Sequence, residues 1–476
     1  MILKNTKIIC TIGPAIENEN TLIKMFETGM DVARINLSHN TPATAIKQVT
    51  RIRNASAKAN KYVAIMLDTK GPEIRTGVFE NGCCEYQDGD VVKLLKEEVL
   101  GCKEQFHINC KELFDDVKVG NKLLVDDGKI TLEVIETTED SITCKFINGG
   151  VIKNHKGINA PNTELSMPFI SEKDYEDIKF GCEQGVDAFA LSFVRCAEDV
   201  LEVRKLLEKF GTPNIEIISK IESRQGIRNL EEILKVSDGI MVARGDLGVE
   251  VDPELVPMYQ KKMIKLANAY GKFVITATHM LESMIENPRP TRAEASDVAN
   301  AILDGSDAIM LSGESAVGKY PIESVRYMVK IAQIAESMID YKQVLEDAKN
   351  NSRGTKNDAI SMAAADIALK MDNVKAIVAF TETGGTARRI FKFRPRVPVI
   401  ACTDDHETAR KLAFYRGINS IYAKYVDDLK MCDEIVKLVA SSMGLISGDQ
   451  IIFIAGFGVQ HGVTNTIRII DVESDN

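Results

Sequence analysis

The chain contains 476 residues, with 59 Lys or Arg against 69 Asp or Glu, which gives a formal net charge of −10. Its length allows about three domains of ordinary size. The negative charge argues against a general nucleic-acid-binding surface. No apolar run approaches the length of a membrane span, and the first residues lack the apolar segment of a signal peptide. We therefore expect a cytoplasmic protein with neither nucleic acid nor a membrane as a partner.

Ten cysteines are spread along the chain without any C-x-x-C pair. Their spacing indicates neither a zinc site nor a disulfide framework. We expect them to be reduced core residues, as in a cytosolic protein.

Three apolar runs in the first 70 residues each end in polar side chains: TKIICTIGPA, DVARINLSHN and YVAIMLDTKG. Stretches with helical spacing separate them, which is typical of a β/α protein. In the second run Arg34, Asn36 and Ser38 alternate with apolar residues. A half-exposed strand would show the same alternation, but the apolar set between them favours a buried strand with a polar tip. The third run ends in Asp68 and Thr69.

Residues 71–168 follow a different pattern, with short β-type runs such as NKLLVDD, KITLEVIE and SITCKFI separated by Gly, Asp and Asn. Helical periodicity is scarce there, so we predict an inserted, small all-β domain. Near its end, NAPNTELSMP is rich in Pro and Asn and suits a hinge. We therefore expect this domain to open and close as a lid.

The β/α alternation resumes in residues 169–345, where Ser171 is the predicted N-cap of the first helix. Five further apolar runs bring the number of β/α units to eight, which predicts a (β/α)8 TIM barrel made of residues 1–70 and 169–345. In such barrels the functional residues lie at the carboxyl ends of the strands. The residues predicted at these ends are Arg34, Asn36, Ser38, Asp68, Thr69, Arg75, Lys220, Glu222, Arg244, Asp246, Thr278, Ser312 and Glu314.

The segment from Ile215 to Asp246 contains the most specific pattern: IEIISKIE, a helical stretch, then GIMVARGD. Residues two apart in a strand share a face, so Lys220 and Glu222 point the same way, and Asp246 ends the neighbouring strand. A solvated ion-pair cluster would explain the charges equally simply. Alternatively, two carboxylates suit Mg²⁺ and the ammonium suits a phosphoryl group or an enolate. The working hypothesis is metal-assisted chemistry on a small anion.

A third domain is predicted in residues 346–476, after a polar linker at 341–355. The runs KAIVAF, PVIAC and IIFIAG, with helices between them, indicate an open parallel α/β sheet. Between the first run and a helix lies TETGGT, whose hydroxyls and amides could form an anion cradle or an ordinary helix cap. The G-x-x-x-x-G-K spacing at 313–319 is no P-loop, since Tyr320 replaces the required small hydroxyl residue.

Several long stretches, in this order, resemble the pyruvate kinase family: TKIICTIGPA, DVARINLSH, LDTKGPEIRTG, ISKIES, VARGDLGVE, TATHMLESM and MLSGESAVGKYP. The resemblance covers the whole chain. It implies a barrel with a β lid after its third strand and a carboxy-terminal α/β regulatory domain. It also implies the final step of glycolysis, in which phosphoenolpyruvate and ADP give pyruvate and ATP.

The resemblance assigns roles to the strand-end residues. Glu222 and Asp246 would hold Mg²⁺ (or Mn²⁺), while Lys220 and Arg34 would neutralise the phosphoryl group in transfer. The amides of Gly245 and Asp246, with Thr278, would bind the substrate carboxylate. Protonation of the enolate would involve water near Thr278, with a relay that includes Ser312 and Glu314.

A second set of residues matches the family's potassium ligands, namely Asn36, Ser38, Asp68 and Thr69. Because Glu73 stands where some relatives have a Lys that supplies the positive charge itself, we expect K⁺ activation. Asn36, His39 and Arg75 match nucleotide-contacting positions. At Cys196 many relatives have a lysine near the nucleotide phosphates, so this contact differs here.

In the third domain the resemblance favours the anion cradle. Thr381, Thr383, Gly384, Gly385 and Thr386 would form an effector loop. The partner loop AGFGVQHGVTNT lacks the Trp and Arg that mammalian relatives use for fructose 1,6-bisphosphate. A sugar phosphate or a nucleotide such as AMP therefore remains open as the effector, and a homotetramer is expected from the family.

Two other functions use parts of the same pattern. A magnesium-dependent barrel lyase or aldolase acting on pyruvate-like acids needs the same Glu/Asp pair, but not the lid, the potassium set or Arg75. A metabolite sensor that retained only the fold would bind phosphoenolpyruvate without turnover.

Overall fold

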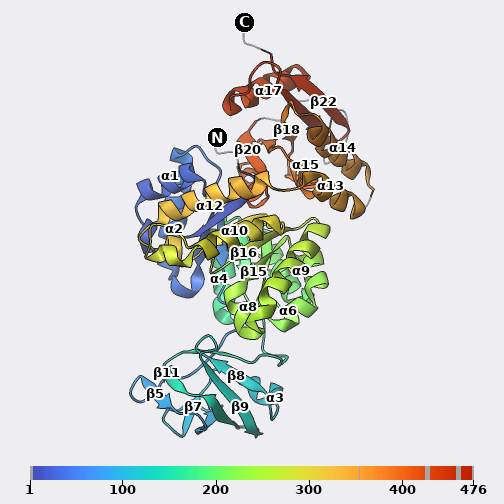
Figure 1. Cartoon of the computed structure of the whole chain (residues 1–476). Coiled ribbons are helices and arrows are strands. Elements are labelled where there is room, and N and C mark those ends of the chain that lie inside the picture. Colours follow the sequence, from blue (N-terminus) through green and yellow to red (C-terminus); the bar gives the residue numbers. More distant parts are fainter. Residues whose placement is uncertain (1–3, 353, 424–428, 457–462, 474–476) are drawn as a thin grey trace.

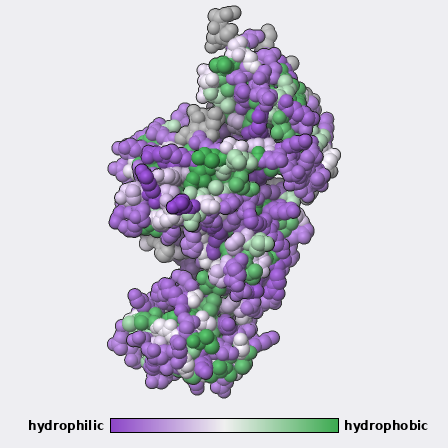
Figure 2. Space-filling view, viewed as in Figure 1, coloured by the Kyte–Doolittle hydropathy of each residue, from purple (hydrophilic) through white to green (hydrophobic). Residues whose placement is uncertain are grey.

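The computed structural model describes residues 4–352, 354–423, 429–456 and 463–473. Three parts follow one another along the long axis of the molecule, with a β lid at one end, a barrel in the middle and the carboxy-terminal sheet at the other end (Figure 1). The surface in Figure 2 is mostly hydrophilic and narrows between the lid and the barrel. Among the helices in the described ranges, none combines the length and apolar character needed to cross a bilayer.

Eight parallel strands close into the predicted barrel, which is thereby confirmed. In chain order they are β1 (Lys7–Thr11), β2 (Val32–Asn36), β3 (Ala64–Asp68), β13 (Ala188–Leu191), β14 (Glu216–Ile221), β15 (Gly239–Ala243), β16 (Phe273–Ala277) and β17 (Ala308–Leu311). Nearly all of their residues are buried, as expected for strands covered by helices on the outside and by packed side chains inside.

Helices surround the barrel and bury their apolar faces against its strands in one continuous core. The outer helices are α1 (Glu19–Thr28), α2 (Pro42–Lys58), α4 (Glu172–Glu183), α5 (Ala197–Lys209), α7 (Leu230–Val236), α9 (Val256–Ala269), α10 (Arg292–Leu303) and α12 (Pro321–Ser337). Further short helices lie in the segments that follow the strand ends: η1 (Pro14–Ile16), η2 (Leu37–His39), α6 (Arg224–Arg228), α8 (Arg244–Glu250), η3 (Pro253–Leu255), η4 (Glu282–Ile285) and α11 (Gly313–Ala316). Ser171 caps α4 as predicted and forms a capping box with Asp174.

The lid follows β3 and is built almost entirely from strands, as predicted. These are β4 (Ile74–Arg75), β5 (Cys83–Tyr86), β6 (Val91–Leu95), β7 (Gln105–His107), β8 (Lys122–Val125), β9 (Ile130–Thr137), β10 (Ser141–Asn148), β11 (Gly150–Lys153) and β12 (Gly157–Asn159), with one short helix, α3 (Leu113–Asp116). Seven of them form one sheet in the order β4-β12-β8-β9-β10-β6-β7, and β11 pairs with β5. Alternating burial along β9 shows that one face covers the lid's own core.

The carboxy-terminal part is an open five-stranded sheet in the order β20-β19-β18-β21-β22. Its strands are β18 (Val374–Phe380), β19 (Val399–Thr403), β20 (Ile418–Tyr422), β21 (Gln450–Ala455) and β22 (Thr466–Asp471); its helices are α14 (Lys356–Lys370), α15 (Gly385–Lys392), α16 (His406–Lys411), η5 (Leu412–Phe414) and α17 (Leu429–Met443). The three predicted runs, in β18, β19 and β21, pair in parallel as expected, but the sheet also has an antiparallel edge strand, because β22 runs antiparallel to β21. An antiparallel edge strand needs only a short connection instead of a helical crossover.

The polar linker predicted at 341–355 is also wrong for most of its length, since residues Tyr341–Asn350 form helix α13. The Asp340 side chain accepts hydrogen bonds from the amides of Lys342 and Gln343, and Leu345 is buried beside Phe393. A single N-cap and a narrow apolar stripe therefore suffice for a helix whose composition is that of a surface segment.

The carboxy-terminal sheet is attached to the barrel at the end opposite the lid (Figure 1). Phe273 of β16 stacks on Phe414 with a centroid distance of 5.5 Å, and Lys7 Nζ donates to the carbonyl of Ile418. Arg388 of α15 pairs with the buried Glu216 at the start of β14, at 2.5 Å. One apolar cluster crosses this junction, so the two parts share a core.

The nine cysteines whose side chains are described are free thiols, as expected. The expectation that they are core residues is wrong for Cys83, which is exposed, and Cys84, Cys102 and Cys196 are only partly buried. Burial alternates along β5, so Cys83 lies on the outward face while Cys84 and Tyr86 pack against the lid core.

Candidate active site

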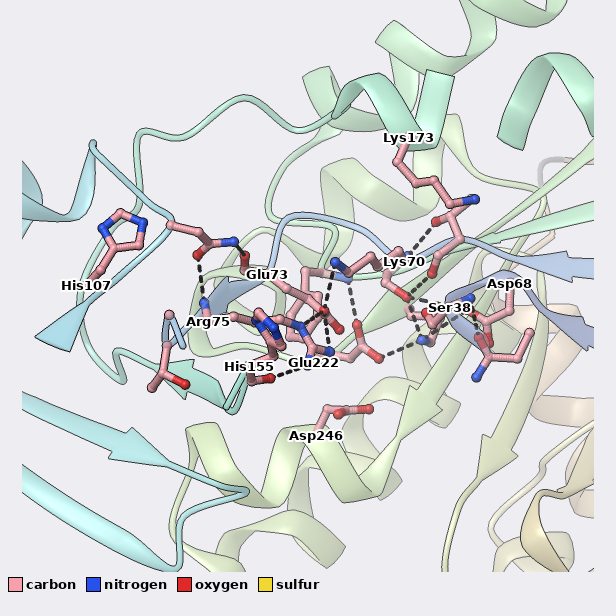
Figure 3. Close-up of a pocket in the computed structure, with 18 of the residues that line it drawn as sticks. Ser38, Asp68, Lys70, Glu73, Arg75, His107, His155, Lys173, Glu222 and Asp246 are labelled. Carbon is pink, nitrogen blue, oxygen red and sulfur yellow. Dashed lines mark hydrogen bonds and ion pairs between the residues drawn. The ribbon is translucent and has the colours of Figure 1, made fainter. Parts of the chain in front are cut away.

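The carboxyl ends of the barrel strands open into a cavity of about 960 Å³ that also borders the lid. Figure 3 shows Asp68, Glu222 and Asp246 around it, with His107 and His155 on the lid side. Nine of the predicted site residues line this cavity: Arg34, Asn36, Ser38, Asp68, Thr69, Arg75, Lys220, Glu222 and Asp246. Gly245 and Thr278 line an adjoining cavity of about 1090 Å³, which also includes Asp246.

Asp68, at the end of β3, is the centre of the charge network. Its Oδ2 accepts a hydrogen bond from Arg34 Nε at 2.7 Å, and its Oδ1 lies 3.2 Å from Lys220 Nζ. Burial opposes the ionised form, but Lys220 and Arg34 outweigh this effect and lower the pKa of Asp68 below its usual value. Asp68 is therefore a fixed negative charge between two cations.

The Lys220 ammonium has three neighbours at hydrogen-bonding distance. It donates to Ser192 Oγ at 2.7 Å and lies near Asp68 Oδ1 and 2.9 Å from Glu222 Oε1. Burial lowers the pKa of a lysine, yet the charges of Asp68, Glu222 and Asp246 hold the pKa of Lys220 above its usual value. Lys220 therefore stays charged and can neutralise an anion in the cavity.

Glu222 is fully buried. Its Oε2 accepts a hydrogen bond from the Phe193 amide at 2.6 Å, and its Oε1 forms an ion pair with Lys220 Nζ at 2.9 Å. Burial raises the pKa of Glu222 to about 8, and the Asp246 charge adds to this effect despite the opposing charge of Lys220. Both oxygens of Glu222 thus have a partner within the chain, and the residue lines the cavity.

A divalent cation fits these donors. Mg²⁺ prefers carboxylate oxygens and commonly keeps water and substrate oxygens as its other ligands. Glu222 and Asp246 supply two carboxylates at neighbouring strand ends. Within the described ranges, no group of three or more His, Cys, Asp or Glu side chains gathers as a metal site.

Thr278 and His279 have φ angles of +68° and +51°, which side chains with a Cβ rarely adopt. The Arg244 guanidinium holds this turn by donating to the Thr278 carbonyl at 2.7 and 3.2 Å, and it pairs with Asp297 at 2.7 Å. As a result, Thr278 Oγ1 accepts a hydrogen bond from the Gly245 amide at 2.7 Å. Such strain is common at functional sites.

Oxygen atoms of the predicted potassium set lie on adjacent strand ends, because the β2–β3 register aligns Asn36 with Asp68. Asn36 Oδ1 accepts from the Ser38 amide at 3.0 Å, and Thr69 is buried next to Asp68. Hydroxyl, amide and carboxylate oxygens are suitable ligands for a hard cation.

Arg75 reaches the cavity from β4, at the entrance to the lid. Its Nε donates to Glu73 Oε2 at 2.7 Å, and its Nη1 donates to the carbonyl of His155 at 2.7 Å. Lys70 lies 3.6 Å from the same Glu73 oxygen. The side chain of His39, the other predicted nucleotide contact, lies outside the described part of the structure.

Ser312 and Glu314 line neither of the two cavities. The Glu314 carboxylate accepts from the amides of Leu281 and Ser312 at 2.9 and 2.7 Å, and burial raises its pKa. Ser312 Oγ is buried without a hydrogen-bond partner. Glu314 therefore connects the end of β17 to the segment that follows Thr278. Its role with Ser312 in a proton relay stays a prediction.

Cys196 lies at the N-cap of α5 and lines neither of the two cavities at the strand ends. Besides Lys220, the lysines that line the cavities around the lid are Lys70, Lys173 and Lys156. These three were not predicted as site residues, nor were Ser192 and Phe193 after the end of β13. Ser192 could have been found from its place directly after a barrel strand, whereas Lys156 depends on how the lid is oriented.

The predicted effector loop joins β18 to α15. Gly384, with φ of +81°, is the residue before the first turn of α15, as expected for a glycine at a tight turn. Thr381 and Thr386 are buried, Thr383 is exposed, and Thr386 Oγ1 lies 3.1 Å from Thr464 Oγ1. Residues 457–462 of the partner loop lie outside the described ranges.

The pyruvate kinase barrel-domain model matches residues 3–325, and the pyruvate kinase alpha/beta-domain model matches residues 358–470. A pyruvate kinase of Geobacillus stearothermophilus is 46% identical over 470 residues, which cover 98% of this chain and 80% of the relative. A Staphylococcus saprophyticus pyruvate kinase is 48% identical over 473 residues, with the same coverage. One from Clostridium acetobutylicum is 45% identical over 479 residues, covering 99% of this chain and all of the relative.

Proposed function

The chain belongs to the pyruvate kinase family, and from that premise we propose how its residues carry out the reaction. The chain is a phosphotransferase that acts in glycolysis. Phosphorus leaves the enol oxygen of phosphoenolpyruvate and bonds to an oxygen of the ADP β-phosphate, and the resulting enolate takes up a proton to give pyruvate. The observation that carries the proposal is the meeting of Arg34, Lys220, Glu222 and Asp246 around one cavity.

Arg34 and Lys220 neutralise the transferring phosphoryl group. A loose phosphoryl transition state spreads negative charge over its oxygens, so the protein contributes mainly charge and alignment. Both cations are fixed in advance: Arg34 by Asp68 and Thr11 Oγ1 at 2.9 Å, and Lys220 by Ser192. Little reorganisation is then needed as the phosphoryl group moves.

Glu222 and Asp246 hold Mg²⁺ or Mn²⁺ in this proposal. When bound, the cation polarises the carboxylate and enolate oxygens of the substrate. The amides of Gly245 and Asp246 bind the substrate carboxylate, and Thr278 beside them serves the protonation step. The Gly245 amide now donates to Thr278 Oγ1, while the Thr278 hydroxyl itself donates to the Ala277 carbonyl at 2.7 Å. A substrate carboxylate at this amide would replace Thr278 Oγ1 as the acceptor.

Asn36, Ser38, Asp68 and Thr69 form the K⁺ site. Support comes from the aligned strand ends that bring their oxygens together. Arg75 and Asn36, with His39, bind the nucleotide at the lid side of the cavity. The neighbouring residue 73 is a glutamate. The chain therefore has no lysine at this position whose positive charge could substitute for K⁺.

Residues 71–168 act as a lid over the barrel made of 1–70 and 169–345, with 346–476 as the regulatory domain. Asn159 Nδ2 of β12 donates to Glu250 Oε1 of α8 at 2.9 Å, so the lid contacts the helix that carries Gly245 and Asp246. A further cavity of about 300 Å³ lies between lid and barrel and leaves room for closure.

The effector site of the regulatory domain is the loop of Thr381, Thr383, Gly384, Gly385 and Thr386. The exposed Thr383 hydroxyl and the start of α15 suit a phosphate group, which a sugar phosphate or a nucleotide would supply. We place the enzyme in the cytoplasm as a homotetramer, in line with the family.

A coupled assay of pyruvate formation tests the proposal. Phosphoenolpyruvate, ADP and Mg²⁺ are supplied with K⁺ or with tetramethylammonium, and sugar phosphates and nucleotides are screened as activators. We expect ATP and pyruvate in equal amounts and stimulation by K⁺. A lyase or aldolase would form no ATP, and a sensor would bind phosphoenolpyruvate without turnover.

A further inference from the structure

Ser192 lies between the predicted potassium site and Lys220, at the end of β13. Its side chain is 3% exposed, and its hydroxyl donates to the Thr69 carbonyl at 2.8 Å. The same oxygen accepts from Lys220 Nζ at 2.7 Å. It therefore contacts a residue of each proposed site.

The direction of these hydrogen bonds is fixed by chemistry. A serine hydroxyl has one proton, and the ammonium of Lys220 can only donate. Because the proton points to Thr69, a lone pair of Ser192 Oγ faces Lys220. The alternative acceptor, Asp68 Oδ1, lies farther away at 3.4 Å.

Thr69 is tied to residue 192 through a second atom. The amide of Ser192 donates to Thr69 Oγ1 at 3.3 Å, and the amide of Thr69 donates to the Ala190 carbonyl at 3.0 Å. Both oxygens of Thr69 that could ligate a cation are thus oriented by Ser192. Gly71 closes the turn with φ of +70°, where an added Cβ would lie 2.8 Å from Ser192 Cβ.

The ammonium of Lys220 also lies between two carboxylates, those of Asp68 and Glu222. Without Ser192 it could move fully onto Glu222 and compete with a divalent cation for that carboxylate. The hydroxyl supplies a neutral acceptor that holds Nζ in place.

We propose that Ser192 is a positioning residue that couples occupation of the potassium site to the placement of the Lys220 ammonium. A cation held by Thr69 and Asp68 orders the Thr69 carbonyl, which orders the Ser192 hydroxyl and through it Lys220. This inference rests on the proposed potassium site.

The test is Ser192→Ala, with Ser219→Ala as the matched control. Ser219 precedes Lys220 in β14, is fully buried, and its hydroxyl lies 2.7 Å from Ser237 Oγ. Both changes remove one buried hydroxyl, but only the first removes a contact with Lys220 and Thr69. The control therefore corrects for a general loss of stability.

Two readouts are compared at constant ionic strength, with tetramethylammonium replacing K⁺. One is kcat for pyruvate formation; the other is the rise in melting temperature with K⁺ in the absence of substrates. In Ser192→Ala we expect kcat to fall about 10- to 100-fold, as for loss of a hydrogen bond to a charged group. The K⁺ concentration for half of the thermal shift should rise about 3-fold or more. In Ser219→Ala neither should change beyond about 2-fold.

An unchanged K⁺ midpoint in Ser192→Ala, with or without a loss of kcat, would overturn the coupling. If the unaltered protein transfers the phosphoryl group but shows no response to K⁺ in either readout, the potassium site itself is wrong and the coupling falls with it. If the unaltered protein forms no pyruvate, the failure lies in the proposed function instead.

Discussion

Lys220 Nζ lies 3.2 Å from Asp68 Oδ1 although their strands, β14 and β3, are not neighbours in the barrel. Strand β13 separates them, and Ser192 at its end fills the space between the two charged groups. The charge network of the site therefore spans three strands. Its stability depends on keeping opposite charges paired in a buried place.

Lys220→Met should abolish most of the activity and also destabilise the protein. Removing the ammonium leaves Asp68 and Glu222 buried without their shared counter-charge, which costs about 3–5 kcal/mol of unfolding free energy. Loss of the cation that neutralises the phosphoryl group should lower kcat by about 10²-fold or more. Urea unfolding and the coupled assay measure the two effects. As a control, Lys58→Met removes an exposed lysine and should change neither kcat nor the unfolding free energy. A kcat within tenfold of normal in Lys220→Met would refute the role of Lys220 in neutralising the phosphoryl group.

Glu73→Lys should reduce the dependence on K⁺. Glu73 Oε2 now binds Arg75 Nε at 2.7 Å, so a lysine there adds positive charge at the cavity and releases Arg75. We expect the activity in tetramethylammonium buffer to approach that in K⁺ buffer. The KM for ADP should rise about two- to fivefold, because Arg75 loses its partly exposed ion pair with residue 73. Glu73→Gln adds no positive charge and should remain K⁺-dependent. Equal K⁺ stimulation in both variants would contradict the idea.

The strand-end residues could be predicted because a buried strand with a polar tip has a clear local signature. Asp68, Lys220 and Glu222 follow this pattern. Helix α13 escaped prediction because its stability comes from one buried side chain, Leu345, and a cap, which a polar composition conceals. The antiparallel edge strand β22 was not among the predicted runs, and strand direction in any case leaves no mark on a short apolar run.

Within the site, the sequence indicated which residues face the cavity but not what they contact. Ser192 was not predicted, because its place between Lys220 and Thr69 depends on three strands meeting. Lys156 belongs to the lid and lines the cavity between the lid and the barrel. The spacing of residues around Lys156 carries no information about which barrel residues it will approach.

Arg244→Lys should lower kcat without a matching change in the KM for ADP. The guanidinium holds the strained carbonyl of Thr278 through two nitrogens and Asp297 through a third. A lysine cannot make this forked contact. Small displacements of Thr278 beside the Gly245 amide should lower kcat by about 10- to 100-fold. Steady-state kinetics measure the change in kcat. Asp297→Asn keeps the guanidinium and should lower kcat less. An unchanged kcat in Arg244→Lys would show that the turn at Thr278 does not need the guanidinium.

Glu216 links the regulatory domain to the strand that carries Lys220. It begins β14, is 2% exposed and pairs with Arg388, three residues beyond the start of α15. Burial, and then the charge of Asp238, raise the pKa of Glu216 to about 7, although Arg388 opposes this. The carboxyl group thus prefers to be neutral more strongly in the folded protein than in the unfolded chain.

The sign of the pH effect follows from this raised pKa. The stabilising contribution of Glu216 is fully present below the unfolded pKa of 4.5 and is lost as the pH rises through about 7. Between pH 5 and pH 8 the unfolding free energy of the unaltered protein should fall by about 1–3 kcal/mol more than that of the Glu216→Gln variant, because glutamine cannot titrate. Urea midpoints of both proteins across this range measure the difference, because other titrating groups cancel in the comparison. Glu208→Gln, an exposed control on α5, should follow the pH profile of the unaltered protein. Parallel profiles for Glu216→Gln and the unaltered protein would mean that Glu216 is ionised with an ordinary pKa in the fold.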